Sequence, residues 1–341
     1  MTSSNESVIL KLAASVLGID AAKAAIAKLE LDPALDSAGS AIVSRASFAM
    51  ALNVVLFDDL LARVPTGAAY VADATVGGGK LFFDHGALRT IRFANGPTGA
   101  LPAGQDAFAR ILKPLGYSVA NVYPLPRLGM TGRAWCHLDA PESIPQFFVS
   151  ELHVERFGAG FERVAQRVFG SSRDPLGKSA YAALAHFAEI ECVPFDLAVA
   201  ALPEIVAAFG RHHDIPALAD YEALLAHSAE AAWIATEGNA FNHATDRVAD
   251  VEALAGAQRT LGRPVKDAVE VSASGRVRQT AFRADHVERR FVDADGATVT
   301  LSVPGSFYEF ITRDVDPATG RLDLGFDSSN AQGIFAMTRA A

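Results

Sequence analysis

The chain has 341 residues, half of them hydrophobic and a fifth charged, and 39 acidic residues against 30 basic ones give a formal net charge of −9. These proportions exclude an intrinsically disordered chain, because such chains combine low hydrophobicity with high charge. The negative charge also argues against nucleic acid or an anionic membrane as a partner, since both are bound through a cationic excess. We therefore expect a globular protein with neither partner.

The N-terminus and the cysteines bear on location. No basic residues precede the apolar stretch at 8–17, so we expect no secretory signal, and the apolar run at 46–57 is too short to cross a bilayer. The two cysteines, Cys136 and Cys192, form no CxxC pair, which argues against a disulfide framework or a thiolate metal site. These features predict a soluble protein of the reducing cytoplasm.

The first half of the chain is predicted to change from helix to mixed structure. Residues 7–64 are rich in Ala, Leu and Ile at helical spacings, and 47–61 has the apolar content of a buried helix. A glycine cluster at 77–79 ends this pattern and precedes a packed segment at 81–90. The elements predicted next are a short helix at 107–115 and strands at 117–123, 133–138 and 146–157.

The second half begins with a helical insertion at about 158–240 and ends in strands. The predicted strands, expected to be antiparallel with a hairpin turn at Asp295-Gly296, are 275–282, 287–292, 298–303 and 306–313. No internal sequence repeat is visible. The pattern predicts one α+β domain over residues 1–341, with a helical N-terminal part at 1–70 in addition to the insertion.

His85 and Arg89 form the first candidate site. Residues four apart share a face in either a helix or a strand, so the two side chains are expected to point the same way. The planar donor fork of Arg suits a carboxylate, so the pair is compatible with a metal ligand next to a carboxylate clamp, although these two residues alone favour a plain surface pair. The adjacent His212 and His213 must point in divergent directions, and we expect neither to be catalytic.

His243 and Glu309 are the other candidates. His243 follows a Gly-Asn exit from an apolar helix, at a predicted junction between elements, where either a ligand or a plain Asn-His turn is expected. Glu309 lies within an aromatic and aliphatic strand, so it either faces solvent or coordinates something. Two His and one carboxylate are the ligands of non-haem Fe(II) oxygenases, but the spacing of these three residues matches no local motif.

Five segments carry a wider pattern in their order and spacing. They are Asp84-His85-Gly86-Ala87-Leu88-Arg89, Phe148-Val149-Ser150-Glu151-Leu152, Ala240-Phe241-Asn242-His243-Ala244-Thr245, Phe307-Tyr308-Glu309-Phe310 and Gly333-Ile334-Phe335. Taken together they resemble the 2-oxoadipate dioxygenase/decarboxylase family, from about residue 47 to the C-terminus. That family is similar in architecture to vicinal-oxygen-chelate enzymes and in chemistry to hydroxymandelate synthase. The resemblance implies a mixed or antiparallel β-sheet core around a metal site.

The resemblance also implies roles for named residues. His85, His243 and Glu309 would bind Fe(II), and Arg89 would grip the substrate carboxylate. The resemblance also implies substrate contacts by Ser329 and Asn330. Gln279 and Arg283 lie on the predicted strand before the hairpin and are further candidates to line the pocket, and Arg283 is equally compatible with a solvated surface.

The implied reaction converts 2-oxoadipate and O2 to 2-hydroxyglutarate and CO2, as in lysine catabolism, without nicotinamide or flavin. Consistently, the chain has no GxGxxG after a strand and no P-loop. The chain is shorter than many members after the Glu309 strand and more polar around 329–330, which makes the reaction class more secure than the substrate. The alternatives are a Zn- or Mn-dependent isomerase or lyase on the same scaffold, and a binding protein without activity.

Overall fold

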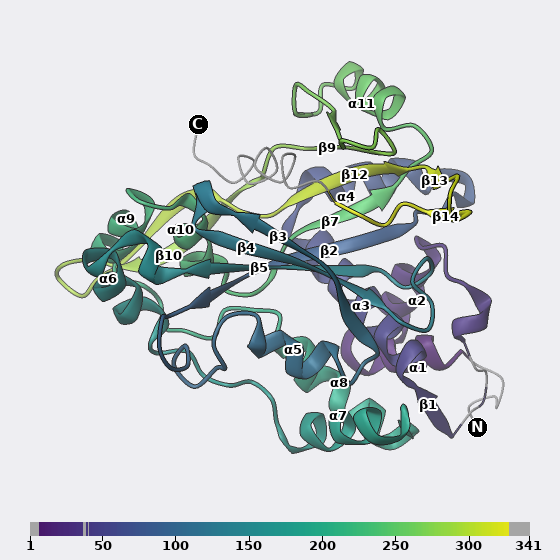
Figure 1. Ribbon diagram of the computed structural model, residues 1–341, viewed down its shortest axis with the longest axis horizontal. Helices are drawn as coiled ribbons and strands as arrows, with labels where there is room; N and C mark the ends of the chain where they lie inside the picture. The colour runs from purple at the N-terminus through teal and green to yellow at the C-terminus, as the bar shows by residue number, and fades with distance from the viewer. Residues whose placement is uncertain (1–6, 37–38, 40, 327–341) are drawn as a thin grey trace.

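The computed structural model describes residues 7–36, 39 and 41–326. A twisted sheet of eight strands, in the order β3-β4-β5-β2-β7-β12-β9-β8, crosses the molecule, and helices pack around it (Figure 1). The helices are α1 (Val8–Leu17), α2 (Ile19–Ala27), α3 (Arg45–Arg63), α4 (Pro65–Ala74), α5 (Asp106–Leu112), α6 (Ala159–Phe169), α7 (Lys178–Ile190), α8 (Phe195–Ala207), α9 (Leu218–Leu225), α10 (Ala229–Glu237) and α11 (Val251–Thr260). The strands are β1 (Ile42–Ser44), β2 (Phe83–Arg92), β3 (Tyr117–Leu125), β4 (Met130–His137), β5 (Gln146–His153), β6 (Cys192–Pro194), β7 (Phe241–Arg247), β8 (Glu270–Val271), β9 (Val277–Ala281), β10 (His286–Val292), β11 (Thr298–Pro304), β12 (Phe307–Arg313), β13 (Val315–Asp316) and β14 (Arg321–Leu322).

Two units of similar topology build the large sheet. The first runs β2-α5-β3-β4-β5, and the second runs β7-α11-β9-β12 with β8 at its edge and the β10-β11 hairpin inserted. In each unit the first and last strands pair in parallel, β2 with β5 and β7 with β12, while β2 and β7 pair antiparallel and join the units. The chain therefore repeats a topology that no sequence repeat reveals.

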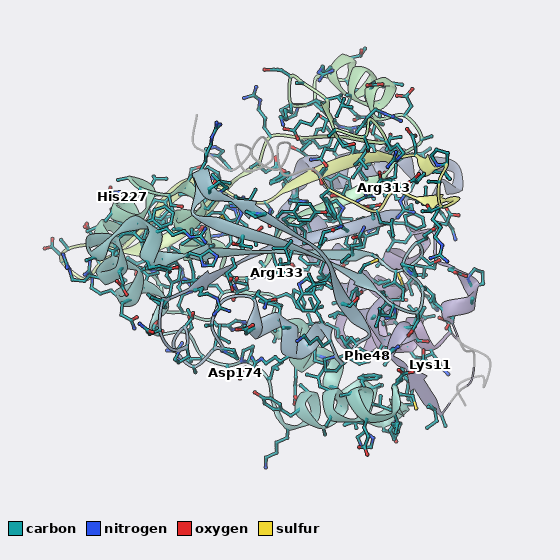
Figure 2. All side chains as sticks on the ribbon, in the orientation of Figure 1. Lys11, Phe48, Arg133, Asp174, His227 and Arg313 are labelled. Carbon is teal, nitrogen blue, oxygen red and sulfur yellow. The ribbon has the colours of Figure 1, made fainter. Side chains whose placement is uncertain are left out.

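The two faces of this sheet have different roles. Successive strand residues point to opposite faces, so Leu88 and Tyr308 lie on the face covered by helices, in the largest hydrophobic cluster. Helix α3 supplies much of that cluster, and its Phe48 ring packs 5.1 Å from Phe187 of α7 (Figure 2). Ser44 caps the N-terminus of α3, because its hydroxyl accepts a hydrogen bond from the Ser47 N–H. Helices α1 and α2 precede α3 in the chain and pack against it.

Helices α6 to α10 lie between β5 and β7 in the chain, and α10 at their end returns to the sheet. There α6, α9 and α10 form a second core with the β10-β11 hairpin, against the same face of β2 that carries His85. The predicted antiparallel pairing holds for β9 with β12 and for β10 with β11, but β12 pairs in parallel with β7. In the described part of the chain, no helix combines the length and apolar content that crossing a membrane requires.

The prediction of an element junction around His243 is wrong, because residues 241–247 form the central strand β7. Its polar side chains made the segment read as a turn. Asn242, His243, Thr245 and Asp246 are all buried, and each has a polar partner inside the protein. Such internal pairing offsets the cost of burying polar groups.

Gly86 on β2 is required by the ring of Phe241. A Cβ at Gly86 would lie 2.3 Å from two ring carbons of Phe241, much closer than any real contact. We expect Gly86→Ala to lower the free energy of unfolding by about 1–3 kcal/mol, the usual cost of overpacking, as measured by urea denaturation. Gly160 in α6 has open space at its Cβ, so Gly160→Ala should leave stability unchanged or raise it. Equal effects at the two positions would contradict this account.

His213 is buried against the Phe169 ring, with its Nε2 2.9 Å from the Ala235 carbonyl oxygen. Burial lowers its pKa from 6.5 to about 4, so the folded state favours the neutral ring. Stability is therefore full above pH 6.5 and falls as the pH drops toward 4, by about 2 kcal/mol at pH 5. Urea denaturation at pH 7 and 5 should show a loss in the wild type and in His227→Gln, an exposed control, that is about 2 kcal/mol smaller in His213→Gln, where the other buried histidines still contribute. An equal loss in His213→Gln and the wild type would assign the acid sensitivity elsewhere.

Candidate metal centre

Three central strands bring the predicted ligands together. His85 on β2 pairs in register with Thr245 on β7, which pairs with Glu309 on β12, so the three side chains form one row across the sheet. His243 lies two residues before Thr245 and therefore points to the same face. The two imidazoles and the carboxylate are at most 5% exposed, and their ligand atoms lie within 4.8 Å of one another.

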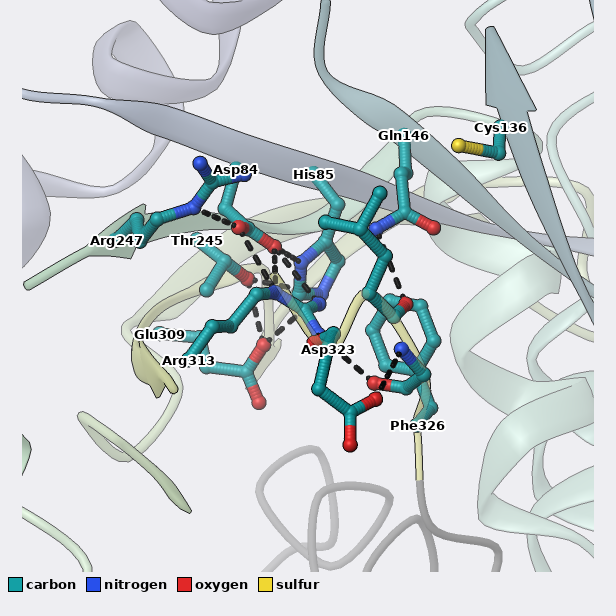
Figure 3. Close-up of polar contacts among 12 residues, drawn as sticks. Asp84, His85, Cys136, Gln146, Thr245, Arg247, Glu309, Arg313, Asp323 and Phe326 are labelled. Carbon is teal, nitrogen blue, oxygen red and sulfur yellow. Dashed lines mark hydrogen bonds and ion pairs between the residues drawn. The ribbon is translucent and has the colours of Figure 1, made fainter. Parts of the chain in front are cut away.

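The donor atoms converge on one oxygen. Glu309 Oε2 lies 3.2 Å from His85 Nε2 and 3.4 Å from His243 Nε2, and it accepts a 2.5 Å hydrogen bond from the Thr245 hydroxyl (Figure 3). The other oxygen, Oε1, is buried and has no hydrogen-bond partner among the described residues. A buried carboxylate oxygen without a donor needs a cation or a proton. Two imidazole nitrogens and this carboxylate fit a divalent transition metal.

Each histidine is held by the residue that precedes it. Asp84 Oδ1 lies 2.8 Å from His85 Nδ1, and the Asn242 amide nitrogen lies 2.8 Å from His243 Nδ1. With Nδ1 engaged in each ring, Nε2 is the nitrogen that faces Glu309. Such contacts fix the orientation of metal-binding histidines. Sequence reasoning missed this role, although a polar residue directly before each histidine was a usable signal.

The protonation states suit metal binding. Burial lowers the pKa of His243 to about 3, so its ring is neutral at physiological pH. Its Nε2 is free to act as a ligand when the Asn242 amide turns its oxygen to Nδ1, because the ring proton then lies on Nδ1. Burial alone would raise the pKa of Glu309, but the neighbouring His243 and His85 rings and the Thr245 hydroxyl outweigh burial and lower it. Burial would lower the pKa of His85, yet the carboxylates of Asp84 and Glu309 on its two sides raise it. A cation at Nε2 would take the place of the proton that these carboxylates favour.

The repeated topology explains why there are three ligands. Glu309 on β12 pairs with the residue two after His243, and the equivalent partner on β5, opposite the residue two after His85, is Phe148. An apolar ring thus occupies the place where a fourth ligand would lie. A six-coordinate ion held by three protein ligands keeps three positions for other molecules.

Arg89 lies further along the same face of β2. Its Cα is about 13 Å from that of His85 at the usual strand rise, so the two residues share a face without touching. The guanidinium is fully buried and lies over the Trp233 ring, 4.9 Å from its centroid. Burial lowers the pKa of Arg89 to about 10, partly offset by Glu230 on the same helix as Trp233, and the side chain remains cationic at neutral pH.

The other predicted substrate residues divide into three cases. Gln279 on β9 is buried and shares the face of Glu309 by register, with its amide donating to Glu270 at 3.3 Å. Arg283 is exposed and lies 3.6 Å from Asp267, so the surface alternative holds for it. Ser329 and Asn330 lie outside the described residues.

Most of the chain matches a known protein family. The family model described as 2-oxoadipate dioxygenase/decarboxylase matches residues 80–322. A chloroplastic 2-oxoadipate dioxygenase/decarboxylase from Arabidopsis thaliana is 25% identical over 289 residues, covering 76% of this chain and 68% of the relative.

Two solved structures show the same fold. A glyoxalase-superfamily protein from Ralstonia eutropha JMP134 is 52% identical, with a TM-score of 0.89 over 94% of this chain and 98% of that one. The hydroxyglutarate synthase of Oryza sativa, solved with 2-oxoadipate, is 23% identical, with a TM-score of 0.65 over 86% of this chain and 92% of that one. The predicted α+β class is confirmed by the sheet and helices described above. Because the family model spans well over half of the sequence, the chain belongs to the 2-oxoadipate dioxygenase/decarboxylase family.

Proposed function

We propose that this protein is an Fe(II)-dependent enzyme that converts 2-oxoadipate and O2 to 2-hydroxyglutarate and CO2. The observation that carries the proposal is the buried His85, His243 and Glu309 group on the face of the sheet that also holds Arg89. Membership of the family supports the same reaction. Two oxygen atoms enter from O2; the products together contain them and all six carbons of the substrate.

The metal ligands and the strand positions define the proposed roles. His85, His243 and Glu309 would hold Fe(II), which supplies the redox chemistry for O2 and the 2-oxo acid when bound. The substrate itself supplies the electrons, so the reaction requires no nicotinamide or flavin. The rings of Phe307 and Phe326 lie 4.8 Å from His243 and His85, respectively, and would keep bulk water from these ligands.

Arg89 would bind the distal carboxylate of the substrate. Between His85 and Arg89, the residue in register with Ala87 is Phe148 on β5, whose ring covers Gly132 and packs with Ala87 and Ala134. The methylene groups of an acid lying along β2 from the metal ligands to Arg89 would pack against this ring. Arg offers a bidentate fork that matches a carboxylate, and here it is buried, where such a contact is strongest.

Further parts of the assignment stay predictions. Substrate contacts by Gln279, Ser329 and Asn330, a place in lysine catabolism and a cytoplasmic location belong to this group. Two relatives support the substrate class, because the hydroxyglutarate synthases of Oryza sativa and Pseudomonas putida were solved with 2-oxoadipate.

Oxygen consumption tests the proposal. The protein is loaded with Fe(II) under anaerobic conditions, a panel of 2-oxo acids led by 2-oxoadipate is added with O2, and products are identified by mass spectrometry. Uptake with a 2-hydroxy acid one carbon shorter is the expected result. Bound metal without uptake for any acid would favour the isomerase or lyase alternative.

A further inference from the structure

Residues 323–326, here called the strap, cross the sheet face at the candidate metal centre. The Phe326 ring lies edge-on to His85 at 4.8 Å and packs 5.1 Å from the Phe148 ring. The Phe326 N–H donates to the Tyr123 hydroxyl at 3.0 Å, and the Gln146 amide donates to the Leu324 carbonyl at 3.3 Å. The strap therefore contacts a metal ligand directly and is anchored to β3 and β5.

Arg313, at the end of β12, joins the strap to the support of His85. Its Nε and Nη2 donate to both oxygens of Asp84 at 2.9–3.1 Å, and Asp84 in turn contacts His85 Nδ1. Its Nη1 donates to the carbonyls of Asp323 and Gly325 at 2.9 and 2.8 Å. The same guanidinium lies 4.9 Å from the centroid of the Phe326 ring. Figure 3 shows Arg313 between Asp84 and the strap.

The Arg313–Asp84 ion pair is completely buried. A buried guanidinium needs all its donors satisfied, and here one set is used on the support of His85 and the other on the strap. No other described arginine contacts both: Arg247 donates to Asp84 but not to the strap, and Arg276 pairs with Asp323 but not with Asp84. The planar guanidinium of Arg313 thus links Asp84, which supports His85, to the strap.

We propose that Arg313 is a positioning residue that couples closure of the strap over the site to the orientation of His85. When the strap is seated, the two carbonyls hold the guanidinium in the plane that presents its other edge to Asp84, and Asp84 fixes the imidazole. Displacing the strap leaves Arg313 Nη1 without its two carbonyl acceptors and loosens the guanidinium that, together with Arg247, holds Asp84 in place. The inference rests on the metal centre of the proposed function, and on no catalytic step.

Arg313→Lys is the variant that tests the coupling, because it keeps the charge and removes the fork. Two properties are measured without turnover. Co(II) affinity is followed by its visible absorption, and seating of the strap is followed by chymotrypsin cleavage after Leu324 or Phe326, read by mass spectrometry. We expect Co(II) affinity to fall about 10- to 100-fold, as for other outer partners of metal ligands, and cleavage to accelerate severalfold.

Two further Arg→Lys variants separate the halves of the link. Arg247→Lys, which alters contacts to Asp84 and to the Glu142 carbonyl but not to the strap, should weaken Co(II) binding without changing cleavage. Arg276→Lys, which alters partly exposed contacts to the Asp323 and Asp316 side chains, should change Co(II) affinity by less than Arg313→Lys. Near-ultraviolet circular dichroism confirms folding of each variant.

Wild-type Co(II) affinity and wild-type cleavage rates in Arg313→Lys would overturn the inference while leaving the metal centre intact. A change in only one of the two properties would likewise overturn the coupling. If the wild type binds no Co(II), both the metal centre and the coupling fail. Should Arg313→Lys not fold, Phe326→Ala tests the link from the strap, and unchanged Co(II) affinity there would contradict it.

Discussion

Replacing Glu309 with alanine is expected to abolish binding of the metal ion. Glu309 is the only carboxylate of the three ligands, and both imidazoles face its Oε2. Without it, the site would offer a divalent cation two neutral rings in a buried, low-dielectric setting. We expect the affinity for Co(II) or Fe(II) to fall by more than the roughly 10- to 100-fold caused by loss of an outer partner. Titration followed by metal analysis of the isolated protein measures the change.

The control for this variant is Glu288→Ala, which removes an exposed glutamate from strand β10. It should bind metal as the wild type does. His243→Ala should behave like Glu309→Ala, because it removes a neutral nitrogen ligand from the same group. Stoichiometric, tight metal binding by folded Glu309→Ala would show that the ion lies elsewhere and would remove the basis for the proposed chemistry.

Much of the secondary structure follows from local patterns. Helix α3 has a long apolar run from Phe48 to Phe57 broken only by Asn53, and β12 begins with an apolar run around Glu309, so both were predictable. The strand β7 was not, because its buried Thr245 and Asp246 are paired by side chains from β2, β12 and α4, which are distant in the sequence. The relative direction of these strands could not be predicted either, because the parallel pairing of β12 with β7 depends on the long connection between them, which begins with α11.

Some residues of the candidate site could be predicted from the local sequence, and others could not. His85 and Arg89 stand out locally, because four residues on a strand return to one face. The prediction that they form one site with His243 and Glu309 came from the resemblance to the family, because the spacing of these residues matches no local motif. The Asp84–Arg313 pair joins residues 229 positions apart and could only be found once β2 and β12 had been placed across β7. No local pattern indicates which of many arginines will meet a given aspartate.

Arg89→Ala should weaken substrate binding while leaving metal affinity unchanged. The guanidinium is buried on the face of the ligands and is no member of the metal-ligand group, and the proposed substrate places its distal carboxylate there. Truncating one partner of a buried charge pair costs about 2–5 kcal/mol, which corresponds to a roughly 30-fold or larger rise in KM. Steady-state oxygen consumption gives KM, and Co(II) titration gives the metal affinity.

The comparison that isolates Arg89 uses 2-oxohexanoate, which lacks the distal carboxylate. The wild type should prefer 2-oxoadipate strongly, and Arg89→Ala should lose most of that preference, because the two substrates then differ at a carboxylate with no partner. Arg290→Ala, which removes an exposed arginine from β10, should keep the preference. If Arg89→Ala discriminated between the two acids as the wild type does, Arg89 would not bind the distal carboxylate, and its burial over Trp233 would have a structural role instead.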